Sequence, residues 1–190
     1  MTLTRGASLT DVAFAVCTAL DRAGIEAVLT GGSAATFYVP TVYQSDDADF
    51  ILRYGAAAAD VRTALGTIGF RQRAGGDFDH PNLQYTVEFP VGPLAIGSDL
   101  VTSWETKHRA QELLHILSPT DVVRDRFLHF YAWPDLSAYS AALRIGRAMR
   151  DLVDWGAFET WARREAEADR TYDLRALERF LRELSMRKRR

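Results

Sequence analysis

Asp47, Asp49 and Glu88 are the residues of this sequence whose types and spacing could support metal chemistry. Asp47 and Asp49 occupy alternate positions at the start of an apolar run, and Glu88 lies within a second apolar segment, YTVEFP. Alternate residues of a β-strand point to the same face, so the two aspartates would share one face while Ala48 and Phe50 enter the core. Carboxylate oxygens are ligands that favour Mg²⁺ or Mn²⁺. The pair therefore predicts a site for divalent cations.

Glu88 is the candidate for a third carboxylate in this site. A charged residue inside an apolar strand needs a reason to be there. Completing a two-metal site is one reason, and an edge-strand position facing water beside Pro90 is the other. Asp46 would point away from its two neighbours as a loop residue, and Asp77 and Asp79 in AGGDFDHP are expected to be turn residues.

Gly31, Gly32 and Ser33 form a motif that could bind phosphate. The glycines follow a short apolar segment and let the backbone turn sharply before a helix that Ser33 would open. Backbone N–H groups and a hydroxyl at such a turn suit a phosphate. Gly-Gly turns before helices are common, so the motif alone does not define a nucleotide site. Ser33 lacks the second glycine of a Gly-x-Ser-x-Gly elbow, which argues against a serine nucleophile.

The composition limits the class of protein. The 190 residues, 47% of them hydrophobic, can bury one core, or a core plus a helical appendage. The sequence contains no run of about eighteen apolar residues, which predicts no membrane span. The N-terminus lacks a signal-peptide pattern, so we expect a cytoplasmic protein. Cys17 is the only cysteine, which excludes an internal disulfide and a cysteine-cluster metal site.

The net charge of −2 conceals an asymmetry along the chain. Residues 1–100 have a balance of −5 and residues 101–190 a balance of +3, and nearly all the bases are arginines. Arg144, Arg147 and Arg150 recur at helical spacing, which indicates either a solvated face or a groove for RNA or another phosphate backbone. An acidic half beside an arginine-rich half would suit a metal site next to an anion-binding surface.

Periodicity and turn residues predict the elements that must position these residues. The expected strands are 25–30, 48–54, 70–74 and 83–89, with 93–97 as an antiparallel or edge partner of 83–89, and a last pair at 102–108 and 112–118. The expected helices are 8–24, 33–39, 56–68, 118–132, 135–149, 156–168 and 173–190. His129 lies in an apolar stretch and is expected to be a core or interface histidine. The predicted fold is α/β (α+β), with a core domain at 1–117 and a C-terminal helical domain at 118–190.

Gly32-Ser33, a spacer of residues 34–46 and then Asp47-Ala48-Asp49-Phe50 resemble the signature of the DNA-polymerase-β-type nucleotidyltransferase superfamily. The resemblance covers roughly residues 25–90. It implies a small mixed β-sheet, two Mg²⁺ ions bound by Asp47 and Asp49, and a triphosphate held at the glycine turn. It also implies that Glu88 helps to hold the second metal ion and activates the attacking hydroxyl.

Residues 118–143 resemble the region that follows the catalytic sheet in the abortive-infection and toxin–antitoxin nucleotidyltransferases of bacteria. A lysine-bearing helix there precedes a basic-x-Asp segment, and here the corresponding residues would be Arg124 or Arg126 and then Asp135. An arginine keeps the charge of a lysine but changes the geometry of phosphate binding. The resemblance implies that Arg126 binds the nucleotide, and it extends to a protein partner of the antitoxin kind.

The sequence therefore predicts a metal-dependent nucleotidyltransferase with an NTP as co-substrate. It would move an NMP onto a hydroxyl of an RNA such as a tRNA end, of a protein or of a small molecule, with pyrophosphate as the second product. The alternative is a non-catalytic nucleotide- or partner-binding module on the same fold. The direction of the Glu88 side chain distinguishes the two, because a two-metal mechanism needs this carboxylate beside Asp47 and Asp49.

Overall fold

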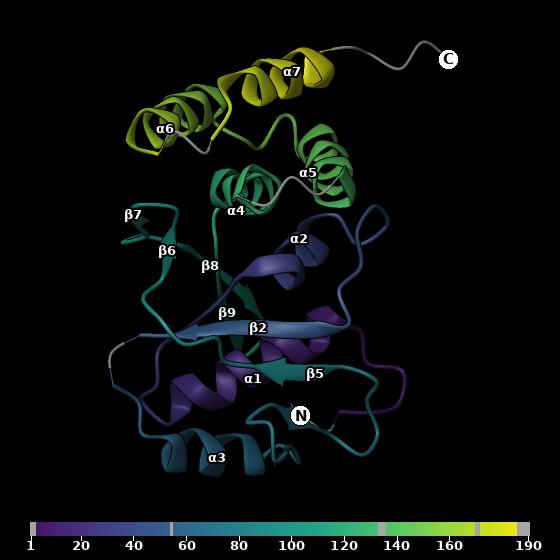
Figure 1. Cartoon of the computed structure of the whole chain (residues 1–190). Helices are drawn as coiled ribbons and strands as arrows, with labels where there is room; N and C mark the ends of the chain where they lie inside the picture. The colour runs from purple at the N-terminus through teal and green to yellow at the C-terminus, as the bar shows by residue number, and fades with distance from the viewer. Residues whose placement is uncertain (1–2, 54, 133–135, 170–171, 186–190) are drawn as a thin grey trace.

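The computed structural model describes residues 3–53, 55–132, 136–169 and 172–185, and it combines a mixed β-sheet with a layered set of helices (Figure 1). Its helices are α1 (Leu9–Arg22), α2 (Gly31–Tyr38), α3 (Ala58–Gly66), α4 (Pro119–Ala132), α5 (Leu136–Ala148), α6 (Trp155–Ala168) and α7 (Leu174–Ser185). Its strands are β1 (Ala27–Leu29), β2 (Asp47–Leu52), β3 (Arg71–Gln72), β4 (Phe78–Asp79), β5 (Thr86–Glu88), β6 (Ala95–Ile96), β7 (Asp99–Leu100), β8 (Glu105–Arg109) and β9 (Glu112–Ile116). Within the described residues, each helix is too short or too polar to cross a membrane.

The main sheet is mixed, as the resemblance over residues 25–90 implies. Its strand order is β3-β4-β5-β2-β1-β9-β8. β2 runs antiparallel to β1 and parallel to β5, whereas β1 runs parallel to β9. The two outer pairs, β3 with β4 and β8 with β9, are antiparallel. β2 and β5 therefore lie side by side within the sheet, and neither forms its edge.

Burial sets the orientation of β2. Ala48 and Phe50 are fully buried, while Asp47 and Asp49, which alternate with them along the strand, are only partly buried. A shift of one residue would put the two carboxylates into the core and the two apolar side chains on the other face, at a large cost. The apolar alternation of this strand therefore fixes where the aspartates point.

The first helix begins and ends where the sequence predicts. The Ser8 hydroxyl accepts from the Asp11 N–H, and the Asp11 carboxylate accepts from the Ser8 N–H in return. Gly24 follows the helix with a positive φ of 74°. Cys17 lies on the buried side of α1, and burial raises the pKa of its thiol to about 12, so the thiol stays protonated and unreactive at neutral pH.

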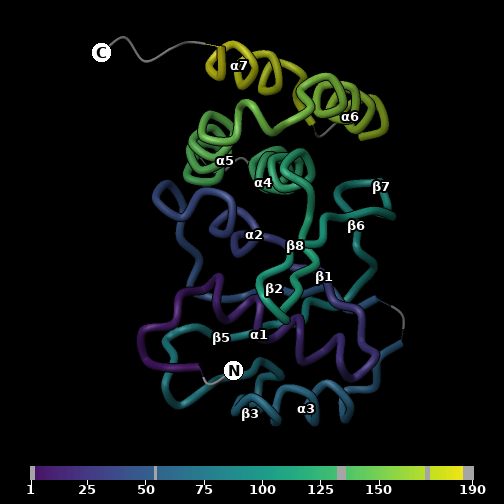
Figure 2. The backbone as a smooth tube through the Cα atoms, turned by 180° about the vertical axis from the view of Figure 1, so that it is seen from behind, coloured from purple at the N-terminus to yellow at the C-terminus, as the bar shows by residue number. Residues whose placement is uncertain are grey.

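The first three helices pack against strands of the main sheet, whereas α4 packs against α2 and β6 and is covered by α5 and α6. Figure 1 shows α3 at one end of the molecule and α5, α6 and α7 at the other, with the sheet between them, and Figure 2 shows the same order from behind. α2 packs against both β2 and α4. α4 begins as predicted, with Pro119 at its first position and the Ser118 hydroxyl accepting from the Asp121 N–H.

Three details of the predicted elements are wrong. Asp79, expected to be a turn residue, lies in the strand β4, where it pairs with Arg71 of β3. α2 begins at Gly31, two residues before the predicted start, so both glycines belong to the helix. Residues 95–96 do form a strand, but they pair with β7 in a separate two-stranded sheet and not with β5. The reason is that both sides of β5 are already occupied, by β4 and by β2.

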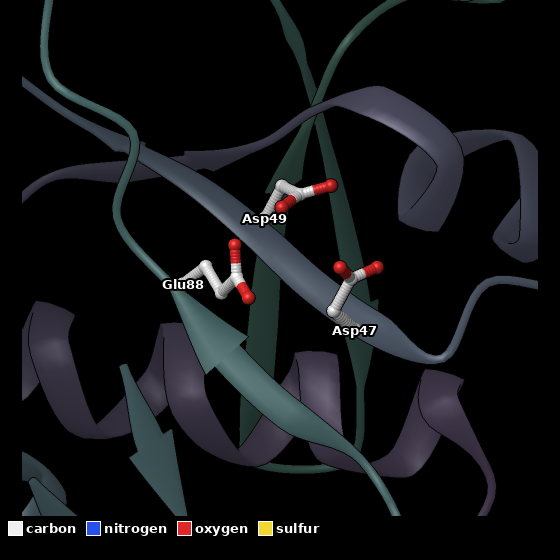
Figure 3. Close-up of side chains that lie close together, drawn as sticks. All are labelled: Asp47, Asp49 and Glu88. Carbon is white, nitrogen blue, oxygen red and sulfur yellow. The ribbon is translucent and has the colours of Figure 1, made fainter. Parts of the chain in front are cut away.

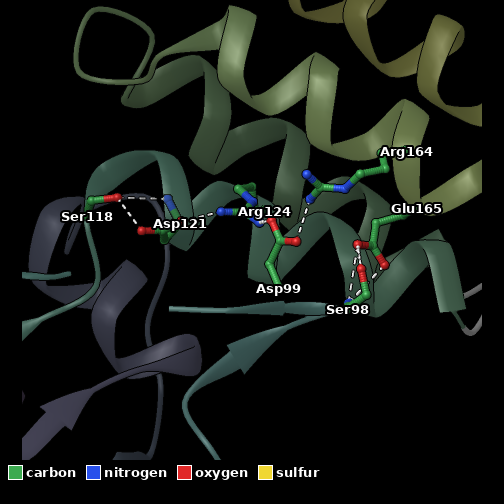
Figure 4. A network of polar contacts seen from close by, with 7 residues as sticks. All are labelled: Ser98, Asp99, Ser118, Asp121, Arg124, Arg164 and Glu165. Atoms are coloured by element: carbon green, nitrogen blue, oxygen red, sulfur yellow. Dashed lines mark hydrogen bonds and ion pairs between the residues drawn. The ribbon is translucent and has the colours of Figure 1, made fainter. Parts of the chain in front are cut away.

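The β6–β7 hairpin is bound to the helical layer through a group of polar residues that we call the hairpin cluster: Ser98, Asp99, Arg124, Arg164 and Glu165 (Figure 4). The Asp99 carboxylate accepts from Arg124 (2.7 Å) and from Arg164 (2.5 Å). The buried Glu165 carboxylate accepts from the N–H and from the hydroxyl of Ser98. The hairpin belongs to residues 1–117 but contacts α4 and α6, so contacts cross the predicted domain division.

Candidate active site

Asp47, Asp49 and Glu88, which we call the carboxylate triad, converge on one point above adjacent strands (Figure 3). Each offers one carboxylate oxygen, and these oxygens lie within 4.8 Å of one another. The register explains the meeting, because Asp49 and Glu88 are directly paired on the parallel strands β2 and β5. The edge-strand interpretation of Glu88 is wrong, since β5 is an internal strand.

The triad accumulates negative charge in a partly buried position. Burial, and after it the charges of Asp47 and Glu88, together raise the pKa of Asp49 to about 6, although the positive charge of Arg126 opposes the shift. Within the described part of the chain, none of the three carboxylates forms a salt bridge. Asp47 accepts one hydrogen bond, from the Ser45 hydroxyl at 2.7 Å.

The geometry of the triad fits a small divalent cation. Mg²⁺ binds oxygen ligands at about 2.0–2.1 Å, so two ligands of one ion lie at most about 4.2 Å apart, and paired ions in two-metal sites lie about 3.5–4 Å apart. Oxygens within 4.8 Å of one another lie close to the limit for one ion, and a pair of ions would span the larger separations. The donors are all carboxylates, the type that Mg²⁺ and Mn²⁺ prefer over nitrogen or sulfur.

The glycine pair lets the start of α2 approach these side chains. Gly31 has a φ of 61°, and a Cβ at this position would lie 2.7 Å from the Asp49 Oδ2 atom. A Cβ on Gly32 would lie 3.0 Å from the Ser45 hydroxyl and 3.1 Å from the Tyr43 hydroxyl. A side chain at either glycine would therefore push the carboxylates and their neighbours away from the helix start.

Ser33 has a different environment from the one that the sequence suggests. Its side chain is buried, donates from the hydroxyl to the Thr30 carbonyl oxygen (2.7 Å) and accepts from the Asp49 N–H (3.1 Å). The hydroxyl thereby ties α2 to β2 and fixes the backbone of Asp49. The remaining polar groups at the helix start are the first backbone N–H groups, which lack intrahelical partners.

Of the two basic candidates on α4, only Arg126 lies near the triad. Its guanidinium is mostly buried and donates to the Asp125 carboxylate from Nε (2.9 Å) and from Nη2 (2.7 Å). Arg124 instead belongs to the hairpin cluster and lies over the Trp161 ring. The downstream acid, Asp135, lies outside the described residues.

Two clefts flank this part of the molecule. The basic cleft, of about 370 Å³, is lined by Tyr43, Arg126, His129, Ser137, Ala138, Ala141 and Arg144. The apolar cleft, of about 330 Å³, is lined by Thr30, Gly31, Asp49, Ile51, Pro90, Pro93, Leu94, Ala95, Ile96, Leu117, Asp125 and His129.

Sequence reasoning missed several residues of these clefts. His129 is an exposed residue that lines both clefts, so the core alternative predicted for it is wrong, and the interface alternative stays a prediction. Tyr43 and Asp125 line the clefts and the Ser45 hydroxyl donates to Asp47, and the sequence predicts a role for none of the three. For Asp125, its position next to Arg126 is a signal in the sequence that it lies near the site. The sequence around Tyr43 and Ser45 contains no such signal, and both residues reach the site through the loop between α2 and β2.

Comparison with known proteins gives similarity of structure but not of sequence. No family model matches the chain, and no curated protein matches it. Among solved structures, an antigenic nucleotidyltransferase-like protein from Paracoccidioides brasiliensis is 16% identical, with a TM-score of 0.49 over 72% of this chain and 74% of that one. The antibiotic-resistance factor ANT(2'')-Ia is 12% identical, with a TM-score of 0.43 over 72% of this chain and 86% of that one. The functional argument therefore rests on the site itself.

Proposed function

We propose that this protein is a metal-dependent nucleotidyltransferase that moves an NMP from an NTP onto the hydroxyl of an acceptor. The observation that supports this function best is the convergence of Asp47, Asp49 and Glu88, whose oxygens lie within 4.8 Å of one another without a salt bridge to any described residue. Burial of uncompensated carboxylates destabilises a fold, and binding of a cation offsets that cost. A purely structural domain has no need of such an arrangement.

The triad would hold Mg²⁺ or Mn²⁺, which when bound stabilises the charge on the attacking and leaving oxygens of an in-line displacement. In the reaction, the acceptor oxygen forms a bond to the α-phosphorus, the bond from that phosphorus to the bridging oxygen breaks, and pyrophosphate leaves. Glu88, on the strand beside the two aspartates, would take the proton of the acceptor hydroxyl. Asp47 and Asp49 would orient the donor for that attack.

The triphosphate would lie between the start of α2 and α4. The first N–H groups of α2, at Gly31, Gly32 and Ser33, form one side of this position, and the Arg126 guanidinium forms the other. Ser33 would contribute its backbone N–H, because its hydroxyl is already hydrogen-bonded within the protein.

The acceptor would enter through the apolar cleft, which has Asp49 in its wall on the side of the triad. Its candidates are an RNA such as a tRNA end, a protein and a small molecule. The resemblance of residues 118–143 to toxin–antitoxin enzymes adds a biological setting to test, in which an antitoxin-like protein would bind the chain.

The test is transfer of label from each α-³²P-NTP, with Mg²⁺, to total bacterial RNA and to lysate protein. We expect label on one class of acceptor with the wild type and none with Asp47→Asn. The matched control is Asp46→Asn, because Asp46 is an exposed neighbour with the same chemistry and lies outside the triad. Nucleotide binding without any transfer would contradict the enzyme and favour the non-catalytic binding module.

A further inference from the structure

Arg144, Arg147 and Arg150 recur at helical spacing, but the fold separates their roles. Arg147 donates from Nη2 to the carbonyl oxygen of Glu183 (2.6 Å), and Arg150 donates from Nη1 to that of Leu184 (3.4 Å). Both oxygens belong to the last turn of α7, where carbonyls lack intrahelical donors and the negative end of the helix dipole lies. Arg147 and Arg150 therefore hold the end of α7 against α5.

Arg144 extends into the basic cleft. Its side chain is exposed, and among the residues that the structure describes no hydrogen bond or ion pair engages its guanidinium. It shares the cleft with Arg126, which projects from the neighbouring helix α4. Two guanidinium groups facing one space repel each other unless an anion lies between them.

The uncompensated positive charge of this cleft comes from Arg144. The charge of Arg126 is offset by Asp125, to which it is bound through two of its nitrogens. Although His129 is an exposed residue, partial burial of its ring in the cleft lowers its pKa, the charge of Arg126 lowers it further, and Asp125 opposes this shift only in part, so the imidazole is neutral at pH 7. Tyr43 adds a hydroxyl but no charge.

The basic cleft continues toward the carboxylate triad. Tyr43 lines the cleft, and its hydroxyl lies with that of Ser45 over Gly32. The Ser45 hydroxyl in turn donates to Asp47. Arg126 is near enough to Asp49 for its charge to lower the pKa of that carboxyl. An anion in the cleft would therefore lie next to a phosphate at the triad.

We propose that Arg144 binds the β- and γ-phosphates of the donor nucleotide, so that the part of the substrate that leaves as pyrophosphate occupies the basic cleft. This inference rests on the proposed function, which places the α-phosphate at the triad. The planar guanidinium matches two phosphate oxygens at once. The cleft, at about 370 Å³, lies within the usual size range of small-molecule sites. Arg144 would thus distinguish nucleoside triphosphates from monophosphates.

Inorganic pyrophosphate is the appropriate probe, because its binding does not depend on the identity of the base. Calorimetric titration of the full chain in Mg²⁺ should show that Arg144→Ala weakens pyrophosphate binding about 10- to 100-fold, as expected for loss of a charge-assisted contact. Arg144→Lys should restore part of the affinity, since it keeps the charge but not the fork. Arg150→Ala is the control for charge, because that side chain faces α7, and it should bind pyrophosphate as the wild type does.

The outcomes separate this inference from the proposed function. Equal pyrophosphate affinity in wild type and Arg144→Ala, with NTP binding intact, would overturn the role of Arg144 and leave the nucleotidyltransferase standing. Failure of the wild type to bind either pyrophosphate or any NTP would overturn both. A selective loss of RNA binding in Arg144→Ala, with pyrophosphate affinity unchanged, would assign this side chain to an RNA backbone instead. AMP affinity should be the same in all the variants, and a weakened AMP affinity in Arg144→Ala would contradict contact with the terminal phosphates.

Discussion

The carboxylate triad and the hairpin cluster both gather acidic side chains, but they differ in how the negative charge is balanced. In the hairpin cluster, Asp99 accepts from two arginines and Glu165 accepts from the N–H and the hydroxyl of Ser98. In the triad, Asp47 accepts a single hydroxyl hydrogen bond, and within the described residues no member forms a salt bridge. The two clusters use the same chemical groups and surround them differently.

This difference separates a structural role from a binding role. In the hairpin cluster the carboxylate oxygens already accept hydrogen bonds, and these bonds fix the position of the hairpin on α4 and α6. Carboxylates without a bound cation lower the free energy of unfolding of the metal-free protein, because they repel one another. Binding of a cation to the folded state raises it again. Removing a charge should therefore stabilise the protein at one cluster and destabilise it at the other.

The largest expected effect is on activity at the triad. Asp49→Asn should lower nucleotidyl transfer by about 10³-fold or more, equivalent to ~4 kcal/mol of activation free energy, because a neutral amide holds a divalent cation poorly. The same change should leave the metal-free fold intact or stabilise it, since it removes repulsion among three carboxylates. Single-turnover transfer rates and urea unfolding in EDTA measure the two effects on one preparation.

Asp46→Asn is the control for this variant and should match the wild type in both measurements. A destabilised Asp49→Asn protein would break the comparison, because it would mean that the triad holds the fold together as the hairpin cluster does. Unchanged transfer would remove the triad from the mechanism.

The next effect is on stability at the hairpin cluster. Glu165→Ala should lower the free energy of unfolding by about 2–3 kcal/mol, because it leaves the Ser98 N–H without its acceptor and opens a space under the hairpin. Glu167→Ala, an exposed change on the same helix, is the matched control and should have little effect. Urea unfolding followed by circular dichroism measures both. A Glu165→Ala protein as stable as the control would show that the filled acceptors contribute nothing.

The sequence predicted the triad because the signals for it are local. The alternation of charged and apolar residues along β2 determines which face its aspartates occupy. A charged residue inside the apolar segment YTVEFP indicates a role for Glu88. The predicted helices and strands follow from the same kind of evidence, namely periodicity and caps. Each of these features depends on residues that are neighbours along the chain.

The features that could not be predicted depend on docking between distant segments. The prediction of a strand at residues 95–96 is confirmed. The partner of this strand, however, depends on which strands of the main sheet still have an unpaired edge, and that is not visible in the sequence. The spacing of the three arginines after residue 143 predicted a shared face, yet the end of α7 engages two of them and leaves Arg144 to the cleft. The sequence predicts that the Ser33 hydroxyl binds phosphate, because it does not show that this hydroxyl accepts a hydrogen bond from the Asp49 N–H of β2.

A smaller effect should follow when a cation binds. Saturating Mg²⁺ should raise the free energy of unfolding of the wild type by about 1–2 kcal/mol, as expected for a ligand that binds only the folded state. Mg²⁺ and an NTP together should raise Tm by more than the sum of their separate effects, because they share one site. Asp49→Asn should lose the response to Mg²⁺, and Glu167→Ala should keep it. An equal response in Asp49→Asn would place the bound ion elsewhere and break the comparison.

The smallest effect is the pH dependence of the metal-free protein. The folded-state pKa of Asp49 is about 6, above the value near 3.9 of an unfolded aspartate, so the folded state binds the extra proton between these values. Protonation of Asp49 therefore raises the free energy of unfolding at low pH, and this stabilisation is lost as pH rises through about 6. Allowing for its partial exposure, lowering the pH from 7 to 5 in EDTA should stabilise the wild type relative to Asp49→Asn by about 1 kcal/mol. Urea midpoints of the two proteins at both pH values measure this difference.

Saturating Mg²⁺ should abolish this stabilisation by low pH, because the bound cation replaces the proton as the partner of the triad. A difference that persists in Mg²⁺ would mean that Asp49 titrates without taking part in metal binding.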